Sequence, residues 1–102
     1  MNVYSYRARP VIIEAVQWDG SMAMADGIEV WSNGVTQCYA RWAQEPELKD
    51  TDKGLEIALY ITTPEGTMRA DPRDWIAKGT RGEFYAIKPD VFAANYEKVV
   101  EA

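Results

Sequence analysis

The chain has 102 residues, 47% hydrophobic and 26% charged, a composition typical of one soluble globular domain rather than a disordered or membrane protein. Eleven basic and sixteen acidic residues give a formal net charge of −5, which argues against nonspecific binding to the phosphate backbone of nucleic acids. The absence of histidine and the presence of one cysteine exclude Ser-His and Cys-His nucleophile pairs and a zinc site built from thiolates.

No apolar run approaches the roughly 20 residues of a membrane-spanning helix, and the first ten residues, MNVYSYRARP, lack the apolar stretch of a signal peptide. Cys38 has no second cysteine with which to form an intramolecular disulfide, as expected in a reducing compartment. We therefore expect a single domain over residues 1–102, no membrane association and a cytoplasmic location.

The first predicted strand covers Pro10–Trp18, where β-branched residues alternate with others and the proline stands at the entry, a position that tolerates its missing amide hydrogen. The next segment, SMAMAD, predicts a short helix because alanine and methionine favour helix. We expect Ser21 or Asp19 to cap this helix and Gly27 to stop it.

Asn33-Gly34 lies between two β-prone runs, Ile28–Trp31 and Val35–Trp42. Both turn residues tolerate the positive φ of a type I′ turn, so the sequence predicts a β-hairpin here. The following segment, AQEPELKDTDKG at 43–54, is polar and interrupted by a proline and a glycine, so we expect a surface loop.

Leu55–Thr63 has the clearest strand pattern, because large apolar residues alternate with smaller or polar ones. The tight turn at 64–66 is expected to return the chain into an antiparallel strand, Thr67–Ala70. Two further apolar runs, Trp75–Ala77 and Glu83–Ile87, each follow a turn. With Thr67–Ala70 they predict a meander of neighbouring strands.

Pro89 and Asp90 are suited to begin a helical turn over VFAANY, and a last extended piece is expected at Glu97–Val100. Many short strands and one or two helices predict an α+β fold that is mainly β. We expect a small curved antiparallel sheet, a roll or a partly open barrel, with a helix covering an edge or an end.

Two stretches resemble a known family: YRARPVIIEAVQW near the start and ADPRDWIxKGxxGEFYxxKPDVFxxxYE near the end. They are similar to a group of small proteins encoded by tailed bacteriophages and prophages, and more loosely to the PGDYG-motif family. The resemblance covers Tyr6–Trp18 and Met68–Glu97, about two-fifths of the chain. It implies a phage or prophage origin and action inside a bacterial cell, and it brings no established activity with it.

Such relatives usually read Pro-Gly-Asp-Trp where this chain has Pro72-Arg73-Asp74-Trp75. Glycine at the second position permits the positive φ of a type II turn. Arg73 instead predicts a type I turn and a reshaped loop.

The segment from Arg69 to Lys88 holds five basic and three acidic residues, a local basic surface that suits a small anionic ligand better than a long polyanion. If the three strands lie side by side, their cations converge on such a ligand and an aromatic ring offers a face for stacking. Phe84 and Tyr85 face opposite sides of their strand, so only one of them can belong to the site. The candidate ligand-binding residues are Arg69, Trp75, Lys78, Arg81, Glu83, Tyr85 and Lys88. The alternative is a solvated charged face without a ligand.

No catalytic set is recognisable. Asp71 and Asp74 bracket a turn and Asp90 stands at a predicted helix start, positions where aspartate accepts backbone hydrogen bonds. Residues 79–82 lack the lysine and hydroxyl spacing of a phosphate-binding loop. We therefore expect no enzyme activity, no cofactor and no metal ligands.

The leading functional prediction is an accessory protein that acts by binding, through self-association and a host or virion protein partner. Aromatic and methionine residues that a small sheet cannot fully bury motivate it, namely Met22, Met24, Trp31 and Trp42. The alternative prediction is a small-molecule binder that sequesters a nucleotide-like anion through the basic and aromatic residues near the C-terminus. Neither prediction involves nucleic acid or a membrane.

Overall fold

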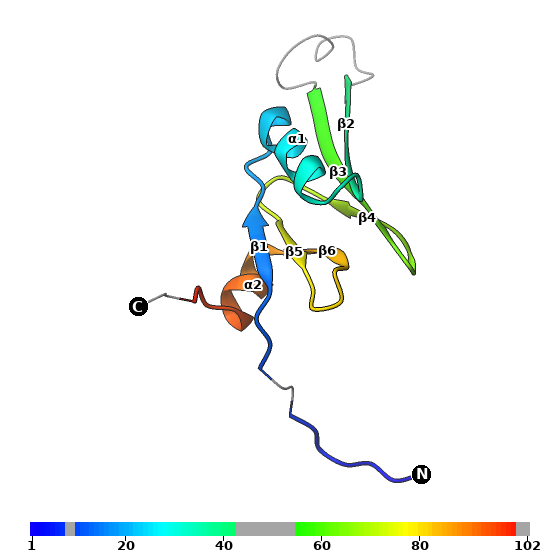
Figure 1. Ribbon diagram of the computed structural model, residues 1–102, viewed down its shortest axis with the longest axis vertical. Coiled ribbons are helices and arrows are strands. Elements are labelled where there is room, and N and C mark those ends of the chain that lie inside the picture. The colour runs from blue at the N-terminus through cyan, green and yellow to red at the C-terminus, as the bar shows by residue number, and fades with distance from the viewer. Residues whose placement is uncertain (8–9, 43–54, 100–102) are drawn as a thin grey trace.

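The computed structural model describes residues 1–7, 10–42 and 55–99 (Figure 1). The elements are, in chain order, β1 (Glu14–Gln17), α1 (Met22–Trp31), β2 (Thr36–Trp42), β3 (Leu55–Thr63), β4 (Gly66–Ala70), β5 (Trp75–Lys78), β6 (Phe84–Ile87) and α2 (Pro89–Asn95). The predicted α+β class with mainly β content is confirmed. The loop predicted at 43–54 lies outside the described residues.

The strands divide between two open antiparallel sheets rather than following one curved sheet. Sheet A has the order β1-β5-β6 and sheet B the order β2-β3-β4. The predicted pairings of β3 with β4 and of β5 with β6 are both present. However, β4 does not join β5 and β6, because β5 pairs with β1 instead.

The segment predicted to form a hairpin around Asn33-Gly34 is instead the end of a helix. Ser21 Oγ accepts the amide of Met24 at 3.1 Å and caps α1, which then continues through Gly27 to Trp31. Asn33 and Gly34 do adopt positive φ, 55° and 85°. Their amides donate to the carbonyls of Val30 and Glu29, the two hydrogen bonds of a Schellman helix end.

The turn between β4 and β5 also differs from its prediction. The amide of Asp74 donates to the carbonyl of Asp71 at 3.0 Å, and Arg73 has a φ of 80° at the third turn position. That value is typical of a type II turn, so the predicted type I turn is wrong. The amide of Arg73 donates to the carbonyl of Trp18, and the amide of Trp18 donates to the carbonyl of Asp74. These bonds to the chain after β1 hold the turn in this shape.

The core lies between α1, sheet B and one face of sheet A. Its buried members are Trp18, Ala25, Ile28, Leu59, Ile61, Ala70, Ile76 and Phe84. Leu59 and Ile61 are fully buried, as the alternation in β3 predicts, and each such side chain contributes about 1.5–3 kcal/mol to folding. Burial of Ile28 explains why α1 passes Gly27, because stopping there would leave Ile28 exposed.

On the other face of sheet A, α2 packs against Trp75, and Figure 1 shows this helix beside the start of β1. The ring of Trp75 stacks on Phe92 with 3.9 Å between centroids, and Phe92 stacks on Tyr96 at 4.9 Å. None of the residues of α2 is itself buried, so these rings hold the helix to the sheet. Within the described ranges, no helix has the length and apolar character needed to cross a membrane.

Candidate functional site

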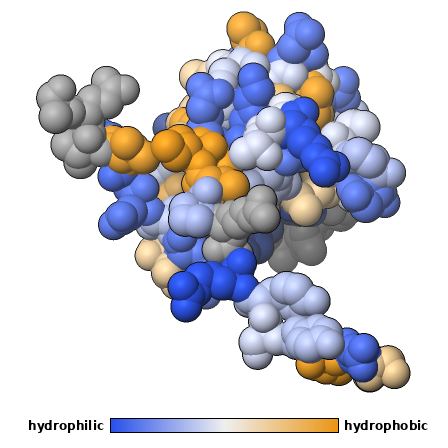
Figure 2. All heavy atoms as spheres, turned by 60° about the horizontal axis from the view of Figure 1, so that its bottom comes forward, coloured by the Kyte–Doolittle hydropathy of each residue, from blue (hydrophilic) through white to orange (hydrophobic). Residues whose placement is uncertain are grey.

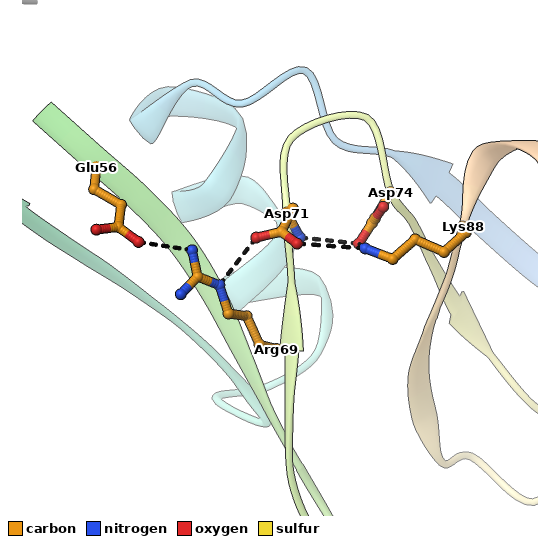
Figure 3. Close-up of polar contacts among 5 residues, drawn as sticks. All are labelled: Glu56, Arg69, Asp71, Asp74 and Lys88. Carbon is orange, nitrogen blue, oxygen red and sulfur yellow. Dashed lines mark hydrogen bonds and ion pairs between the residues drawn. The ribbon is translucent and has the colours of Figure 1, made fainter. Parts of the chain in front are cut away.

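Five charged side chains form a continuous chain of ion pairs between the two sheets (Figure 3). Arg69 lies 2.8 Å from Glu56 and 2.9 Å from Asp71, measured between nitrogen and oxygen atoms. The Nζ of Lys88 lies 3.3 Å from Asp71 and 2.8 Å from Asp74. We call these residues the ion-pair chain.

The position of each member follows from the fold. Glu56 and Arg69 stand on the adjacent strands β3 and β4, and Lys88 follows β6 directly. Asp71 and Asp74 belong to the turn that leads from sheet B to sheet A, where the buried carboxylate of Asp74 also accepts the amide of Asp71 at 2.9 Å. The ion-pair chain therefore fixes this turn and connects the two sheets.

Each cation in the ion-pair chain is held in its charged form by its carboxylate partners. The hydrogen bond to Asp74 raises the pKa of Lys88, although partial burial opposes the shift. Hydrogen bonds to Glu56 and Asp71 raise the pKa of Arg69 further above its already high value. In turn, Arg69 lowers the pKa of Asp71. Lys88 is thus an ammonium at neutral pH and is not available as a nucleophile or a base.

Of the four predicted cations, Arg69 and Lys88 lie close together in the structure. Both are paired with carboxylates. Two cations and three carboxylates give the ion-pair chain a net charge of −1. An anionic ligand would have to compete with Asp71 and Asp74 for both cations. The ion-pair chain is therefore a structural connection, and it does not concentrate positive charge.

The other two predicted cations lie elsewhere. Lys78 pairs across the sheet with Phe84, whose ring centroid is 6.0 Å from its Nζ, whereas Lys88 follows the opposite end of β6, ~13 Å further along. Arg81 is in the turn between β5 and β6 and lines a separate hollow of about 650 Å³ with Glu65 and Glu83. The four cations do not share one surface.

The predicted aromatic and acidic members of the site have structural contacts. Trp75 and Tyr85 share the face of sheet A that α2 covers, where Trp75 stacks on Phe92. Burial, together with Tyr96, raises the pKa of Tyr85. The carboxylate of Glu83 accepts the amide of Arg81 at 3.0 Å and closes the turn between β5 and β6. Within the described ranges, no group of three or more His, Cys, Asp or Glu side chains could hold a metal ion.

A different surface, which the sequence did not indicate, follows the free edge of β1. β1 stands at the end of sheet A, and its only partner among the described strands is β5. A groove of about 470 Å³ lies on the α1 side, lined by Glu14, Ala15, Val16, Met24, Gly27, Ile28 and Trp31. A second, of about 580 Å³, lies on the α2 side, where Val11–Ile13 and Ala15–Gln17 face Trp75, Phe92 and Tyr96.

The residues before β1 continue this surface and are strongly exposed. Val11 is 59% exposed and Ile12 is 77% exposed. Val11, Ile12 and Val99 line the second groove. Figure 2 shows a group of hydrophobic atoms on this side of the molecule. We call Val11, Ile12, Ile13, Ala15 and Val16 the β1 edge. In the sequence, three successive apolar residues, Val11–Ile13, directly precede β1. This apolar run is the signal that could have identified the surface.

The residues that motivated the binding prediction are less exposed than expected. Trp31 is half-buried and meets Phe84 edge-on at 5.1 Å, and the half-buried Met24 packs against the core. Met22 is 50% exposed, and the side chain of Trp42 lies outside the described part of the chain. Among the described residues, Val11 and Ile12 of the β1 edge and Tyr4 and Tyr6 of the N-terminal segment are exposed apolar residues, and others, such as Val30 and Val91, lie on the helices.

Comparisons of the chain with protein-family models, with curated proteins and with solved structures found no significant match in any of the three.

Proposed function

We propose that this protein is a noncatalytic accessory protein of a tailed bacteriophage or prophage, which acts in the bacterial cytoplasm by binding. Its binding surface is the β1 edge, and its partners are further copies of itself and a host or virion protein. The observation that carries the proposal is a free strand edge with an apolar groove on each side.

A free edge presents unpaired N–H and C=O groups in a row, and an extended segment of a partner can pair with them as an added strand. The side chains of such a segment point alternately to the two faces of the sheet. At the β1 edge both faces offer a groove, so side chains of both sets find apolar surroundings. Backbone pairing supplies affinity and the grooves supply specificity.

Two features limit pairing at the β1 edge, namely the short length of β1, four residues, and the charge of Glu14 within it. Sheet edges that are protected from pairing are short or carry lysines, prolines, bulges or inward-pointing charges. Between Val11 and Val16 the only charged residue is Glu14, and the only proline nearby, Pro10, precedes the run. The exposed apolar residues Val11 and Ile12 lie just before this strand, and a bound partner would cover them.

The ion-pair chain supports a noncatalytic role. Asp74 is buried, and its carboxylate is paired with the ammonium group of Lys88 at 2.8 Å, so the two charges neutralise each other. A pair used for proton transfer needs a pKa near the working pH, whereas the pKa of Lys88 is raised further from neutrality.

The test compares two lysine substitutions of exposed apolar residues. Ile12→Lys places a charge on the β1 edge, and Val30→Lys places the same charge on α1, where Val30 is 81% exposed and lines neither groove. Neither change affects the core, which circular dichroism and thermal unfolding would verify. Sedimentation velocity measures self-association, and capture from bacterial lysate measures a protein partner.

We expect the wild type and Val30→Lys to associate equally and Ile12→Lys to bind at least tenfold more weakly. Equal association of all three proteins would place the interface elsewhere. A wild type that stays monomeric at every concentration and captures no partner would overturn the proposal.

A further inference from the structure

The face of sheet B that points away from the core carries two tyrosines in contact with each other. In β3, Leu59 and Ile61 are buried in the core, so Tyr60 between them points to the opposite face. Tyr39 of β2 stands opposite Ala58 and therefore shares this face with Tyr60. The two rings meet edge-on, with 5.2 Å between centroids and 78° between planes. We call Tyr39 and Tyr60 the tyrosine pair.

A hollow lies on each side of the tyrosine pair. The first has a volume of about 410 Å³ and is lined, besides the pair, by Gln37, Thr62 and Thr67. The second has a volume of about 240 Å³ and is lined, besides the pair, by Ala40, Glu56, Ala58 and Arg69. On β3 the first hollow is lined by residues 60 and 62 and the second by residues 56, 58 and 60. The two hollows are thus offset along β3 by about three residues, or ~10 Å.

The polar groups around the tyrosine pair are uncharged or already neutralised. The hydroxyl of Tyr39 donates to Oε1 of Gln37 at 3.1 Å, which leaves the amide NH₂ of Gln37 to donate to a ligand. Within the described ranges, the hydroxyls of Tyr60, Thr62 and Thr67 have no hydrogen-bond partner. In the second hollow, Arg69 and Glu56 are paired with each other at 2.8 Å. This face therefore favours an uncharged partner that accepts hydrogen bonds.

The position on a sheet face also restricts the backbone of such a partner. Hydrogen bonds of a sheet run between neighbouring strands, so a peptide that crosses the face cannot pair its N–H groups with the sheet backbone. Proline has no N–H group and keeps its carbonyl acceptor. A proline-rich segment thus loses no backbone donor on this face, and its carbonyls accept from the side-chain donors there. Its polyproline II helix is also formed before binding, so little conformational entropy is lost.

We propose that the tyrosine pair binds a proline-rich segment of a partner protein in the polyproline II conformation, with its axis roughly along β3. This helix has three residues per turn and rises ~3.1 Å per residue, so one turn covers ~9 Å. That length matches the offset of the two hollows, and one proline ring fits each hollow with the tyrosine pair between them. The inference goes beyond the proposed function, because this face is separate from the β1 edge.

Decaproline is the test ligand, because it is an uncharged polyproline II helix apart from its ends. Titration of the full-length, isotope-labelled protein by NMR measures the dissociation constant and locates the site. We expect amide shifts on β2, β3 and β4, and we expect Tyr39→Ala to bind about tenfold more weakly or worse. Tyr6→Ala is the matched control, because it removes a tyrosine that is 89% exposed in the N-terminal segment. This control should bind as the wild type does.

A second variant leaves both rings in place. Thr67 lies on β4, the edge strand of sheet B, and its side chain is exposed, so Thr67→Lys fills the first hollow without removing a core contact. Circular dichroism and thermal unfolding verify that it and Tyr39→Ala are folded. We expect Thr67→Lys to weaken decaproline binding as well.

The outcomes separate this inference from the proposed function. No binding of decaproline, shifts confined to other elements, or equal binding by Tyr39→Ala and the wild type would each overturn it. Binding of maltotriose in place of decaproline would also overturn it and would assign the first hollow to a neutral sugar. Ile12→Lys, which tests the β1 edge, should bind decaproline as the wild type does, so either proposal can fail while the other stands.

Discussion

The amide of Arg73 donates a hydrogen bond to the carbonyl oxygen of Trp18 at 2.8 Å and ties the turn between β4 and β5 to the end of β1. The amide of Trp18 completes the connection by donating to the carbonyl of Asp74 at 3.0 Å. Trp18 is fully buried, so these bonds lie at the border of the core. They determine that β5 turns towards β1 and away from β4.

Arg73 holds this position at a conformational cost, because its φ of 80° is unfavourable for a residue with a Cβ atom. We expect Arg73→Gly to raise the free energy of unfolding by up to about 1 kcal/mol, since relief of strain exceeds the added freedom of the unfolded chain. Urea denaturation measures the change. Arg73→Ala is the control, because it removes the guanidinium and keeps the Cβ. If alanine stabilises as much as glycine, the strain is not the cause.

Two glycines seven positions apart should respond to alanine in opposite ways. Gly27 lies inside α1 with no atom near an added Cβ, so Gly27→Ala should stabilise by about 0.5–1 kcal/mol through helix propensity. Gly34 also has free space, but its φ is +85°, so Gly34→Ala should destabilise by about 1 kcal/mol. Thermal unfolding of both variants provides the measurement. If a β-hairpin replaced the second half of α1, Gly27 would not lie inside a helix, and Gly27→Ala would not stabilise the protein.

The contribution of Asp71 should depend on pH in a defined direction. Its hydrogen bond with Arg69 lowers the pKa of the carboxyl below the ordinary value of 3.8. A lowered folded-state pKa stabilises the protein above pH 3.8, and this stabilisation is lost as the pH falls through the folded-state value. The difference in unfolding free energy between wild type and Asp71→Asn should therefore be largest near neutral pH and shrink below pH 3.8. Glu65→Gln, in the exposed turn before β4, should follow the wild type throughout.

Nucleotides should not stabilise this protein. Arg69 and Lys88 are paired with carboxylates, and Lys78 and Arg81 lie apart from them. A ligand present at a hundred times its dissociation constant adds ~2.7 kcal/mol to the folded state, which a thermal-shift screen detects readily. We expect no shift with mono-, di-, tri- or cyclic nucleotides. A shift that Lys88→Met abolishes would contradict this expectation.

Self-association should become stronger as salt is added. Each copy carries a net charge of −5, so two copies repel each other, whereas the β1 edge has one charged residue. The charged residue in question is Glu14, which lies within the stretch of the β1 edge. Raising NaCl from about 0.1 M to about 1 M shortens the screening length from ~10 Å to ~3 Å and reduces the repulsion between copies. Sedimentation equilibrium at the two salt concentrations should show a lower dissociation constant at the higher one. A weaker dimer at high salt would indicate an interface held by ion pairs.

Local sequence patterns predicted those parts of the fold that depend on neighbours in the chain. The alternation in β3, the turn before β4 and the hairpin of β5 and β6 were all read correctly, because each unit is closed by a short turn. Pro89 likewise marked the start of α2. The sequence could not reveal that β5 would pair with β1, since that pairing depends on contacts between residues roughly 60 positions apart.

The Asn33-Gly34 pair shows why the hairpin was predicted in place of a helix end. Positive φ at both positions satisfies a type I′ turn and a Schellman motif equally well. The choice depends on whether Ile28–Trp31 is helical, and the β-prone residues there become helical because Ile28 and Trp31 pack on the core. The pattern of cations in the sequence likewise does not show that Asp71 pairs with Arg69 or that Asp71 and Asp74 pair with Lys88.

The pairing of β1 with β5 also has a consequence for synthesis of the protein. A chain leaving the ribosome can complete sheet B once residue 70 has emerged, but β1 has no strand to pair with until residues 75–78 follow. Until those residues emerge, both edges of the β1 segment are open. A fold whose first strand pairs with its second would close that edge earlier in synthesis.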